Sequence, residues 1–352
     1  MKGINQLITL PMLCLLISID SGVFSQSIQV GIIDYYGTKL PNTDIKSCLP
    51  FRENDTIRFF TDSISYVKAK NLIVDCLLTK PQIKQADIIF ICCDAIEGKW
   101  MAFIGVSDKA KSNSNNKNTN SQIKDLKLPK EITNTYDSLE DLRLEGIQSG
   151  QAGDDHTEGH SLLEYPPSRK LQEKFRTYAE IYLKLLQNVI RNSKYPYQRA
   201  VASTVIAYCH DKKEIINNLL EGAKDNNGLV RNNAIRAIGI NLEYSQKQPN
   251  LNIKVSPDLF ITLMNSLSWS DRNKSAGILM TMSMQRDPKF LAQLKKNVLE
   301  SLVDMAKWKS EGHAMAAYMI LGRMGGWTEK EIFESSKNDR SKMVDKMLIQ
   351  IK

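Results

Sequence analysis

The sequence has few of the residues that build most catalytic sites. Its 352 residues include only 4 histidines, and no CxxC pair or Cys/His tetrad is present that would hold a structural zinc ion. GxSxG, P-loop and dinucleotide-binding motifs are absent, as is a pair of carboxylates placed for catalysis. We therefore expect a protein that is not an enzyme, with no catalytic residue, no cofactor and no bound metal.

Cysteine is also scarce. Five cysteines remain once Cys14, near the N-terminus, is set aside, and they are Cys48, Cys76, Cys92, Cys93 and Cys209. The number is odd, and the spacing is not that of a disulfide framework. Two alternatives stay open: one bridge forms in the N-terminal part, such as Cys48 to Cys76, or all five are mostly buried free thiols that pack as small hydrophobic side chains.

Long apolar runs are absent beyond the first 25 residues. Lys2 precedes a mostly apolar stretch from Leu7 to Ile19, and Val23-Phe24-Ser25 forms a plausible cleavage site. The stretch is too short for a good membrane span, which needs about 20 apolar residues. We expect residues 1–25 to be an export signal and the mature chain to be periplasmic or extracellular. An uncleaved anchor is the alternative.

Four helix starts in the C-terminal half share one small residue. The stretch from Asp225 to Gly239 can be laid over segments that begin at Gln198, Arg272 and His313. The shared alanines are separated by 32, 42 and 41 residues, and they are Ala202, Ala234, Ala276 and Ala317. Helix-pair solenoids repeat with such a period, because one helical hairpin cannot bury its own apolar face. The pattern predicts stacked helical hairpins that touch at these alanines.

The second of these segments resembles a HEAT repeat. Asp225, Val230, Arg231 and Ala234 match the Asp, Val-Arg and Ala positions of that family at the start of a repeat's second helix. In HEAT proteins the Asp and Arg form a ladder between adjacent repeats, so the resemblance implies a structural role for Asp225 and Arg231. Among the other segments only Arg199 repeats the arginine. We expect residues 167–352 to form an all-α HEAT-like solenoid.

The N-terminal part has a different periodicity. Three segments are typical of strands: 28–37, 86–94 and 99–106. Two segments between the first and second strands have the capping residues and apolar spacing of helices: 42–49 and 63–78. A short loop that contains glycine joins the last two strands. We therefore predict an α+β module over residues 26–108, with the order strand, helix, helix, strand, strand.

This order resembles a POTRA domain. The likeness is carried by Tyr36-Gly37 leading into a short helix, by the loop from Pro50 to Asp55, and by the closing hairpin. In that family the loop typically contains a glycine-rich or acidic turn, and here Glu53-Asn54-Asp55 fills it without glycine. POTRA domains are extracytoplasmic and bind proteins by adding a strand to the edge of their sheet. The resemblance implies the same contact for this module.

Hydrophobic periodicity is lost over residues 109–166. Residues 112–121 are of low complexity, and residues 146–159 are rich in glycine and polar side chains. Such a composition cannot bury enough apolar surface to offset the entropy lost on ordering. We predict a disordered linker, with a short helix at most around residues 137–144.

One motif inside this linker has the residue types of a metal site. His156 and His160 stand four residues apart beside Asp154, Asp155 and Glu158, and on a helix such a pair can ligate a metal ion. Glycines at 153 and 159 argue against a helix, and the carboxylate does not directly follow the first histidine. The motif is therefore interpreted as solvated linker.

Positive charge is concentrated in the helical half. Residues 169–352 carry 30 basic and 18 acidic side chains, whereas residues 131–168 carry 1 basic and 9 acidic ones. A positive solenoid could attract an anionic partner, and Arg236, Arg272 and Lys274 are the residues we expect to bind it. Two alternatives remain open. The basic side chains could simply solvate the outer helix faces, or the acidic stretch could lie against the basic helices of its own chain.

These observations describe a multidomain, exported interaction scaffold that binds through a basic HEAT-like solenoid and a small POTRA-like module. We expect a protein partner, with an anionic protein as one candidate. A membrane surface is a further candidate, and nucleic acid is not expected. Two other functions stay open: a regulatory or sensor partner of an envelope system, and an enzyme or polyanion-binding protein on a HEAT-like scaffold. The sequence does not predict the oligomeric state.

Overall fold

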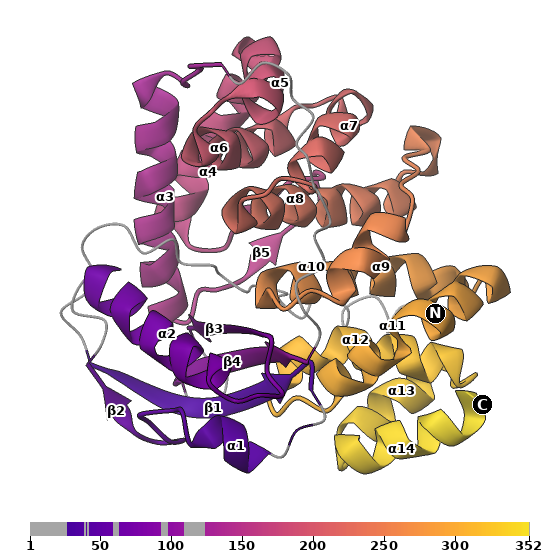
Figure 1. Cartoon of the computed structure of the whole chain (residues 1–352). Helices are drawn as coiled ribbons and strands as arrows, with labels where there is room; N and C mark the ends of the chain where they lie inside the picture. The colour runs from indigo at the N-terminus through magenta and orange to yellow at the C-terminus, as the bar shows by residue number, and fades with distance from the viewer. Residues whose placement is uncertain are drawn as a thin grey trace. The chain divides into compact units, whose positions relative to one another are not determined.

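The computed structural model describes residues 27–38, 40, 42–58, 63–92, 98–108 and 124–351 (Figure 1). The described residues fall into two units. The first unit contains residues 124–259, and the second combines the described part of residues 27–108 with residues 260–351. The predicted export signal, the low-complexity segment 112–121 and most of the predicted hairpin loop lie outside the described residues.

The second unit contains a four-stranded mixed sheet. Its strands are β1 (Ile28–Tyr36), β2 (Thr56–Ile57), β3 (Gln85–Ile91) and β4 (Trp100–Ser107), in the spatial order β2-β1-β4-β3. Strand β1 runs parallel to β4 and antiparallel to β2, and β3 runs antiparallel to β4. Helices α1 (Asn42–Lys46) and α2 (Ser63–Leu78) lie between β1 and β3 in sequence. The predicted element order is therefore present, with β2 as an additional short strand.

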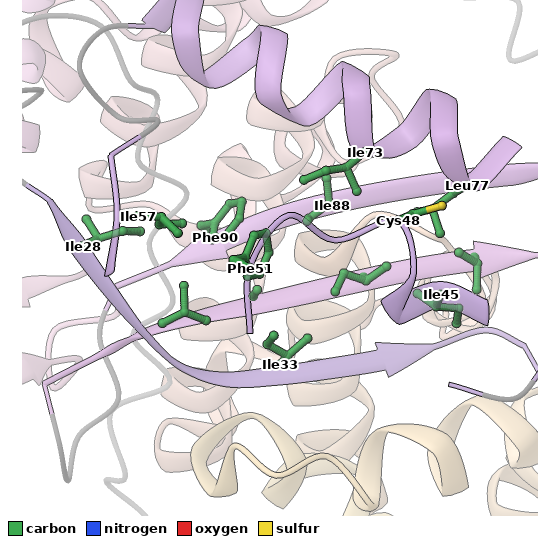
Figure 2. Close-up of a cluster of buried hydrophobic side chains, with 14 of the residues drawn as sticks. Ile28, Ile33, Ile45, Cys48, Phe51, Ile57, Ile73, Leu77, Ile88 and Phe90 are labelled. Carbon is green, nitrogen blue, oxygen red and sulfur yellow. The ribbon is translucent and has the colours of Figure 1, made fainter. Parts of the chain in front are cut away.

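One face of this sheet forms a hydrophobic core with α1 and α2. Ile73 and Leu77 of α2 and Ile45 of α1 belong to one buried cluster with Ile88 and Phe90 of β3 (Figure 2). Alternate residues of β4, at 102, 104 and 106, belong to the same core, as expected for a strand whose successive side chains point to opposite faces. One face of each long strand is therefore buried in this core.

The opposite face of the sheet is covered by helices from the other end of the chain. These helices are α10 (Trp269–Met282), α11 (Pro288–Ala306) and α12 (Glu311–Met324). Helices α13 (Glu329–Ser336) and α14 (Arg340–Ile351) follow in sequence and pack against α12. Phe103 of β4 lies with its ring centroid 5.3 Å from that of Trp269, 5.1 Å from that of Trp308 and 5.2 Å from that of His313. The Tyr36 hydroxyl donates to the Leu267 carbonyl over 2.6 Å.

These contacts correct the predicted architecture of a module tethered to a separate solenoid. The module shares one unit with residues 260–351, because both faces of its sheet are buried. The signal was present in β4, where Met101-Ala-Phe-Ile-Gly-Val106 is apolar on both faces. A strand that is apolar without alternation is typical of a sheet covered on both sides.

The first unit is built mainly from helices. In chain order they are α3 (Lys130–Gln148), α4 (Pro166–Ile181), α5 (Leu183–Asn192), α6 (Pro196–Val205), the 3-10 turn η2 (Ile206–Tyr208), α7 (Lys212–Gly222), α8 (Gly228–Lys247) and the 3-10 turn η3 (Pro249–Leu251). Helix α6 packs against both α5 and α8, and α7 packs against both α5 and α8. Helix α9 (Asp258–Met264) begins at the boundary between the units. None of the helices in the described residues is long and apolar enough to span a membrane.

The second part of the predicted linker is ordered, which corrects the prediction of disorder for residues 124–166. Helix α3 has 19 residues and buries Ile132, Tyr136 and Leu139, which recur at i, i+4 and i+7 on one helix face. Strands β5 (Asp154–Asp155) and β6 (Leu162–Leu163) then form a short antiparallel hairpin. The many polar residues concealed this apolar stripe, and the predicted short helix at 137–144 is only the middle part of α3.

The four repeated alanines are fully buried. Ala202 of α6 and Ala234 of α8 belong to the first unit, and Ala276 of α10 and Ala317 of α12 belong to the second. A Cβ atom built on Gly222 of α7 would lie 3.0 Å from the Ala234 Cβ, so this helix crossing accepts only small residues. The repeat therefore marks helix contacts, in two pairs that the unit boundary separates.

Candidate functional site

Among the described residues, β3 is an edge strand of the sheet. Its sheet neighbour is β4, and it stands last in the strand order. Helix α2 packs beside it, and the Lys70 ammonium of α2 lies 2.7 Å from the Asp87 carboxylate of β3. Val67, Lys70, Val74 and Leu78 follow one another at intervals of three or four residues, so their side chains lie on the same side of the helix.

This side of α2 is partly apolar and partly exposed. Val67 is 49 % exposed and Leu78 is 43 % exposed, while Val74 is half-buried against the core. The row Val67, Lys70, Val74 and Leu78, which we call the α2 row, therefore borders the edge of β3. A chain that paired with β3 would place alternate side chains against the α2 row.

The ion pair between Lys70 and Asp87 crosses the edge of the strand. Ile88 and Phe90 point into the core under α2, so the alternation of a strand places the Asp87 side chain on the opposite face. Lys70 reaches it from α2, which requires its side chain to pass the outer edge of β3. Both side chains are about one-third exposed. Such a pair contributes little stability, but a charge at an edge hinders indiscriminate strand pairing.

A disulfide braces the same module. Cys48, just after α1, is bonded to Cys76 in the last turn of α2, with their Cα atoms 5.6 Å apart. Cys92 also takes part in a disulfide, whereas Cys209 is a buried free thiol. The alternative in which all five thiols are free is therefore wrong, and the bridge named in the sequence analysis is present. Closing a loop of this length stabilises the fold by about 3 kcal/mol.

In the first unit, the motif of two histidines is part of a buried polar network. The Asp154 carboxylate of β5 pairs with the Arg236 guanidinium of α8 and accepts a hydrogen bond from the Ser161 hydroxyl. His156 lies between two carboxylates: its Nε2 is 3.0 Å from Asp154 Oδ2, and its Nδ1 is 3.0 Å from Glu243 Oε2. The network fixes the β5–β6 hairpin to α8.

Charge sets the protonation of this network. Burial alone would lower the pKa of His156, but the carboxylates of Asp154 and Glu243 outweigh it and raise the pKa to about 9. Burial alone would raise the pKa of Asp154, but Arg236 and His156 hold it well below its usual range. His156 is therefore a cation at neutral pH, paired on both sides.

The other end of the hairpin loop meets a group of basic side chains. His160 Nε2 accepts a hydrogen bond from Arg176 Nε of α4 over 3.2 Å, and His160 Nδ1 lies 3.5 Å from Lys212 Nζ of α7. Burial, together with Lys212 and Arg176, lowers the pKa of His160 to about 4. The prediction of a solvated motif is wrong, because both histidines are held by helices of the same unit.

The described residues contain no group of three or more His, Cys, Asp or Glu side chains placed to hold a metal ion. In the motif the ring nitrogens of His156 face carboxylates that already pair with it, and Arg236 pairs with the same Asp154 oxygen, Oδ2, as His156 does. A second cation there would meet the charges of both Arg236 and His156.

The acidic stretch lies against helices of its own chain, as one of the open alternatives stated. Besides the pair of Asp154 and Arg236, Asp155 pairs with Arg169 of α4 over 3.1 Å, and Glu158 pairs with Arg176 over 2.9 Å. These contacts neutralise part of the positive charge of the helical half within one unit. Long-range attraction of an anionic partner is weakened accordingly.

The three residues predicted to bind an anion are engaged inside the chain. Arg236 pairs with Asp154, and Arg272 is 2 % exposed, lies 3.3 Å from Asp304 and stands over the Tyr36 ring. Lys274 is buried and interacts with other groups of the chain. All three residues lie in helices that carry a repeated alanine, α8 and α10. These are the inner helices of their hairpins, which explains why the three side chains are engaged. None of the three offers an exposed charge.

Asp225 and Arg231, which were predicted to be structural, both form hydrogen bonds within the first unit. Asp225 accepts two hydrogen bonds from Arg199, over 2.6 and 2.9 Å, and this pair is buried. Arg231 donates to the Asp225 carbonyl over 2.8 Å. Arg199 lies in the first turn of α6, which packs against α8, so the contact joins two neighbouring helical hairpins. Arg231 instead closes its own turn.

Sequence reasoning missed the α2 row and the contact of Lys212 with His160. The sequence predicted that these residues lie on a helix. It did not predict that the helix borders β3, because that follows only from the strand order. Lys212 and His160 stand 52 residues apart, and no local pattern signals such a contact.

Comparison with known proteins yields no relative: no protein-family model, no curated protein and no solved structure matches this chain.

Proposed function

We propose that the chain is an exported, non-enzymatic interaction scaffold that binds an extended segment of a partner protein along strand β3. The observation that carries the proposal is an edge strand of seven residues bordered by the partly exposed α2 row. An extended segment pairs with such an edge through its backbone, and alternate side chains supply specificity.

The geometry defines the kind of segment that would fit. Every second side chain of the added strand would face Val67, Val74 and Leu78, so apolar residues at alternate positions are expected. Lys70 and Asp87 would lie along the added strand and would favour polar or charged residues between the apolar ones. The POTRA-like order of the module supports this mode of binding, and the HEAT-like helices would be its rigid support.

The cysteines support an exported location. A disulfide within a small module persists in oxidising compartments and is rare in reducing ones. The apolar leader over residues 1–25 is consistent with this location, although it lies outside the described residues. We propose that partner binding takes place outside the cytoplasm, where segments of other exported proteins are available in extended form.

A photo-crosslinking amino acid at position 70 tests the proposal in intact cells. Its side chain would lie at the outer edge of β3, where the added strand is expected. Position 68 is the matched control, because Lys68 is an exposed lysine on the same helix but lies outside the α2 row. We expect a crosslinked partner at position 70, with the crosslink in an extended segment that has alternating apolar residues.

Equal crosslinking at positions 68 and 70, or none at position 70, would contradict binding along β3. Loss of the Lys70 charge alone is not expected to unfold the module, since its ion pair with Asp87 is partly exposed. Circular dichroism of both variants checks this point before the cells are irradiated.

A further inference from the structure

Helix α2 contacts β3 at two places that lie about one helical turn apart. The Lys70 ammonium pairs with the Asp87 carboxylate over 2.7 Å, and the Tyr66 hydroxyl oxygen accepts a hydrogen bond from the backbone N–H of Phe90. Tyr66 and Lys70 stand four residues apart, so they share one side of the helix. The earlier helix residue meets the later strand residue, and α2 therefore runs antiparallel to β3.

The bond to Tyr66 occupies a backbone group that strand addition would use. Successive N–H groups of an antiparallel strand point alternately toward one neighbour and away from it. The Phe90 N–H binds a side chain of α2 and not a carbonyl of β4, so it points to the outer edge of β3. An added strand would place a carbonyl oxygen at this N–H. The Tyr66 hydroxyl already fills that position.

Packing holds the Tyr66 side chain in this place. Its ring centroid lies 6.4 Å from that of Phe90, with the two ring planes at 70°, and the side chain packs against the core between α2 and the sheet. Burial raises the pKa of Tyr66 to about 12, and Asp87 acts in the same direction against the Phe90 N–H. The phenol is therefore neutral at ordinary pH. Moving it aside would take the ring out of the core and leave the N–H without its acceptor.

We propose that Tyr66 is a strand stop, which closes the Phe90 end of the β3 edge and confines an added strand to residues 85–89. The inference rests on the proposed function, because it defines the segment that the edge accepts. Five residues are an ordinary length for a strand. Because α2 runs antiparallel to β3, this open part of the edge lies beside the later residues of the α2 row. The apolar side chains of the segment would therefore face Val74 and Leu78.

A stop at one end also fixes the register of pairing. A segment with apolar residues at alternate positions could pair with a bare edge in several registers, and a slip of one residue would turn its apolar side chains to the wrong face. The Tyr66 ring blocks sliding toward the end of β3. The stop therefore selects short segments and gives them one position on the edge.

Amide hydrogen exchange of the free, full-length protein tests whether Tyr66 covers the edge. Tyr66→Phe keeps the ring in the core and removes the hydroxyl. We expect the Phe90 N–H to exchange about three- to tenfold faster in this variant, because it loses one hydrogen bond. Tyr35→Phe is the matched control, since Tyr35 packs against the same core from β1 and should leave the Phe90 rate unchanged. An unchanged Phe90 rate in Tyr66→Phe, or equal acceleration throughout β3, overturns the stop.

Peptide binding tests the limit on the added strand. The segment recovered by crosslinking at position 70 is synthesised as it stands and with two more residues of its own protein at either end. The wild-type protein should gain no affinity at the end that meets Tyr66, whereas Tyr66→Phe should bind that longer peptide about three- to tenfold tighter than the short one. Equal gains on both proteins overturn the stop. The two failures are distinct: no crosslink at position 70 contradicts strand addition itself, and an unchanged Phe90 rate contradicts the stop alone.

Discussion

The two units fix their non-helical segments by different forces. In the first unit, the β5–β6 hairpin is held by charged groups, with Asp154, His156 and Arg236 at its first strand. In the second unit, the sheet is held to its helices by rings around Phe103 and by backbone N–H groups that bind the Asp34 carboxylate. Apolar burial is insensitive to pH, whereas buried charges are not.

The histidines show what this difference does to one residue type. Two carboxylates raise the pKa of His156 to about 9, although burial acts in the opposite direction. His313 lies in the aromatic group of the second unit, and burial lowers its pKa to about 3. The same side chain is therefore a paired cation in one unit and a neutral aromatic ring in the other.

Removal of the central ring of the aromatic group should have the largest effect. Phe103 is fully buried and touches three other rings, so Phe103→Ala leaves a cavity under the sheet. We expect the free energy of unfolding to fall by about 4 kcal/mol, measured by chemical denaturation with near-ultraviolet circular dichroism of the tryptophans. Phe333→Ala is the control, because this ring is 39 % exposed, and it should cost less than about 1 kcal/mol. Similar losses in the two variants would show that Phe103 is not a core residue.

Loss of one charge from the hairpin network should have the next largest effect. Asp154→Ala leaves the buried Arg236 without its partner and removes one carboxylate from His156. The expected loss is about 3 kcal/mol, because an uncompensated buried charge is costly. A double variant with Arg236→Met should be more stable than Asp154→Ala alone, since both charges are then gone. If the double variant loses the sum of both single effects, the two residues are not coupled.

The third and smallest effect is a pH dependence that differs between the units. The raised pKa of His156 contributes stability that is fully present below pH 6.5 and is lost as the pH rises through about 9. We expect a loss of about 2 kcal/mol between these values, and His156→Gln should flatten this part of the profile. Denaturant titrations from pH 6 to 10 measure it.

Asp34 gives the matching test in the second unit. Burial raises the pKa of Asp34 to about 6, in spite of the N–H groups of Lys309 and Ser310. Its stabilising contribution is therefore present below pH 3.8 and is lost as the pH rises through about 6. Asp34→Asn should flatten the profile between pH 4 and 6 and leave the range above 6.5 unchanged. If Asp34→Asn changed the stability profile above pH 6.5, the assignment of that range to His156 of the first unit would be wrong.

Parts of this fold could be predicted from the sequence because their signals are local. The alanine period identified helix contacts, and the strand and helix spacing gave the element order of the module. The pairing of Cys48 with Cys76 was one of two alternatives that local spacing could not separate.

The remaining features depend on contacts between distant residues. The cover on the second face of the sheet comes from Trp269 and Trp308, more than 160 residues after Phe103. The order of residues 124–166 was missed because the charges that suggested a solvated linker are neutralised by arginines on α4 and α8. Composition reports the charge of a segment but not its partner, and for this reason Arg236 was predicted to be a binding residue.

Hydrogen exchange on the crosslinked complex tests the central claim, strand addition at β3, most directly. The comparison is between the free protein and the protein bound to the segment recovered at position 70. Strand pairing adds hydrogen bonds along the outer edge of β3, so we predict slower exchange within β3 and unchanged exchange in β2 and in the β5–β6 hairpin. The Phe90 N–H, which already hydrogen-bonds to Tyr66, is expected to change least. Unchanged exchange in β3, with protection on the helices instead, would contradict binding along the edge strand.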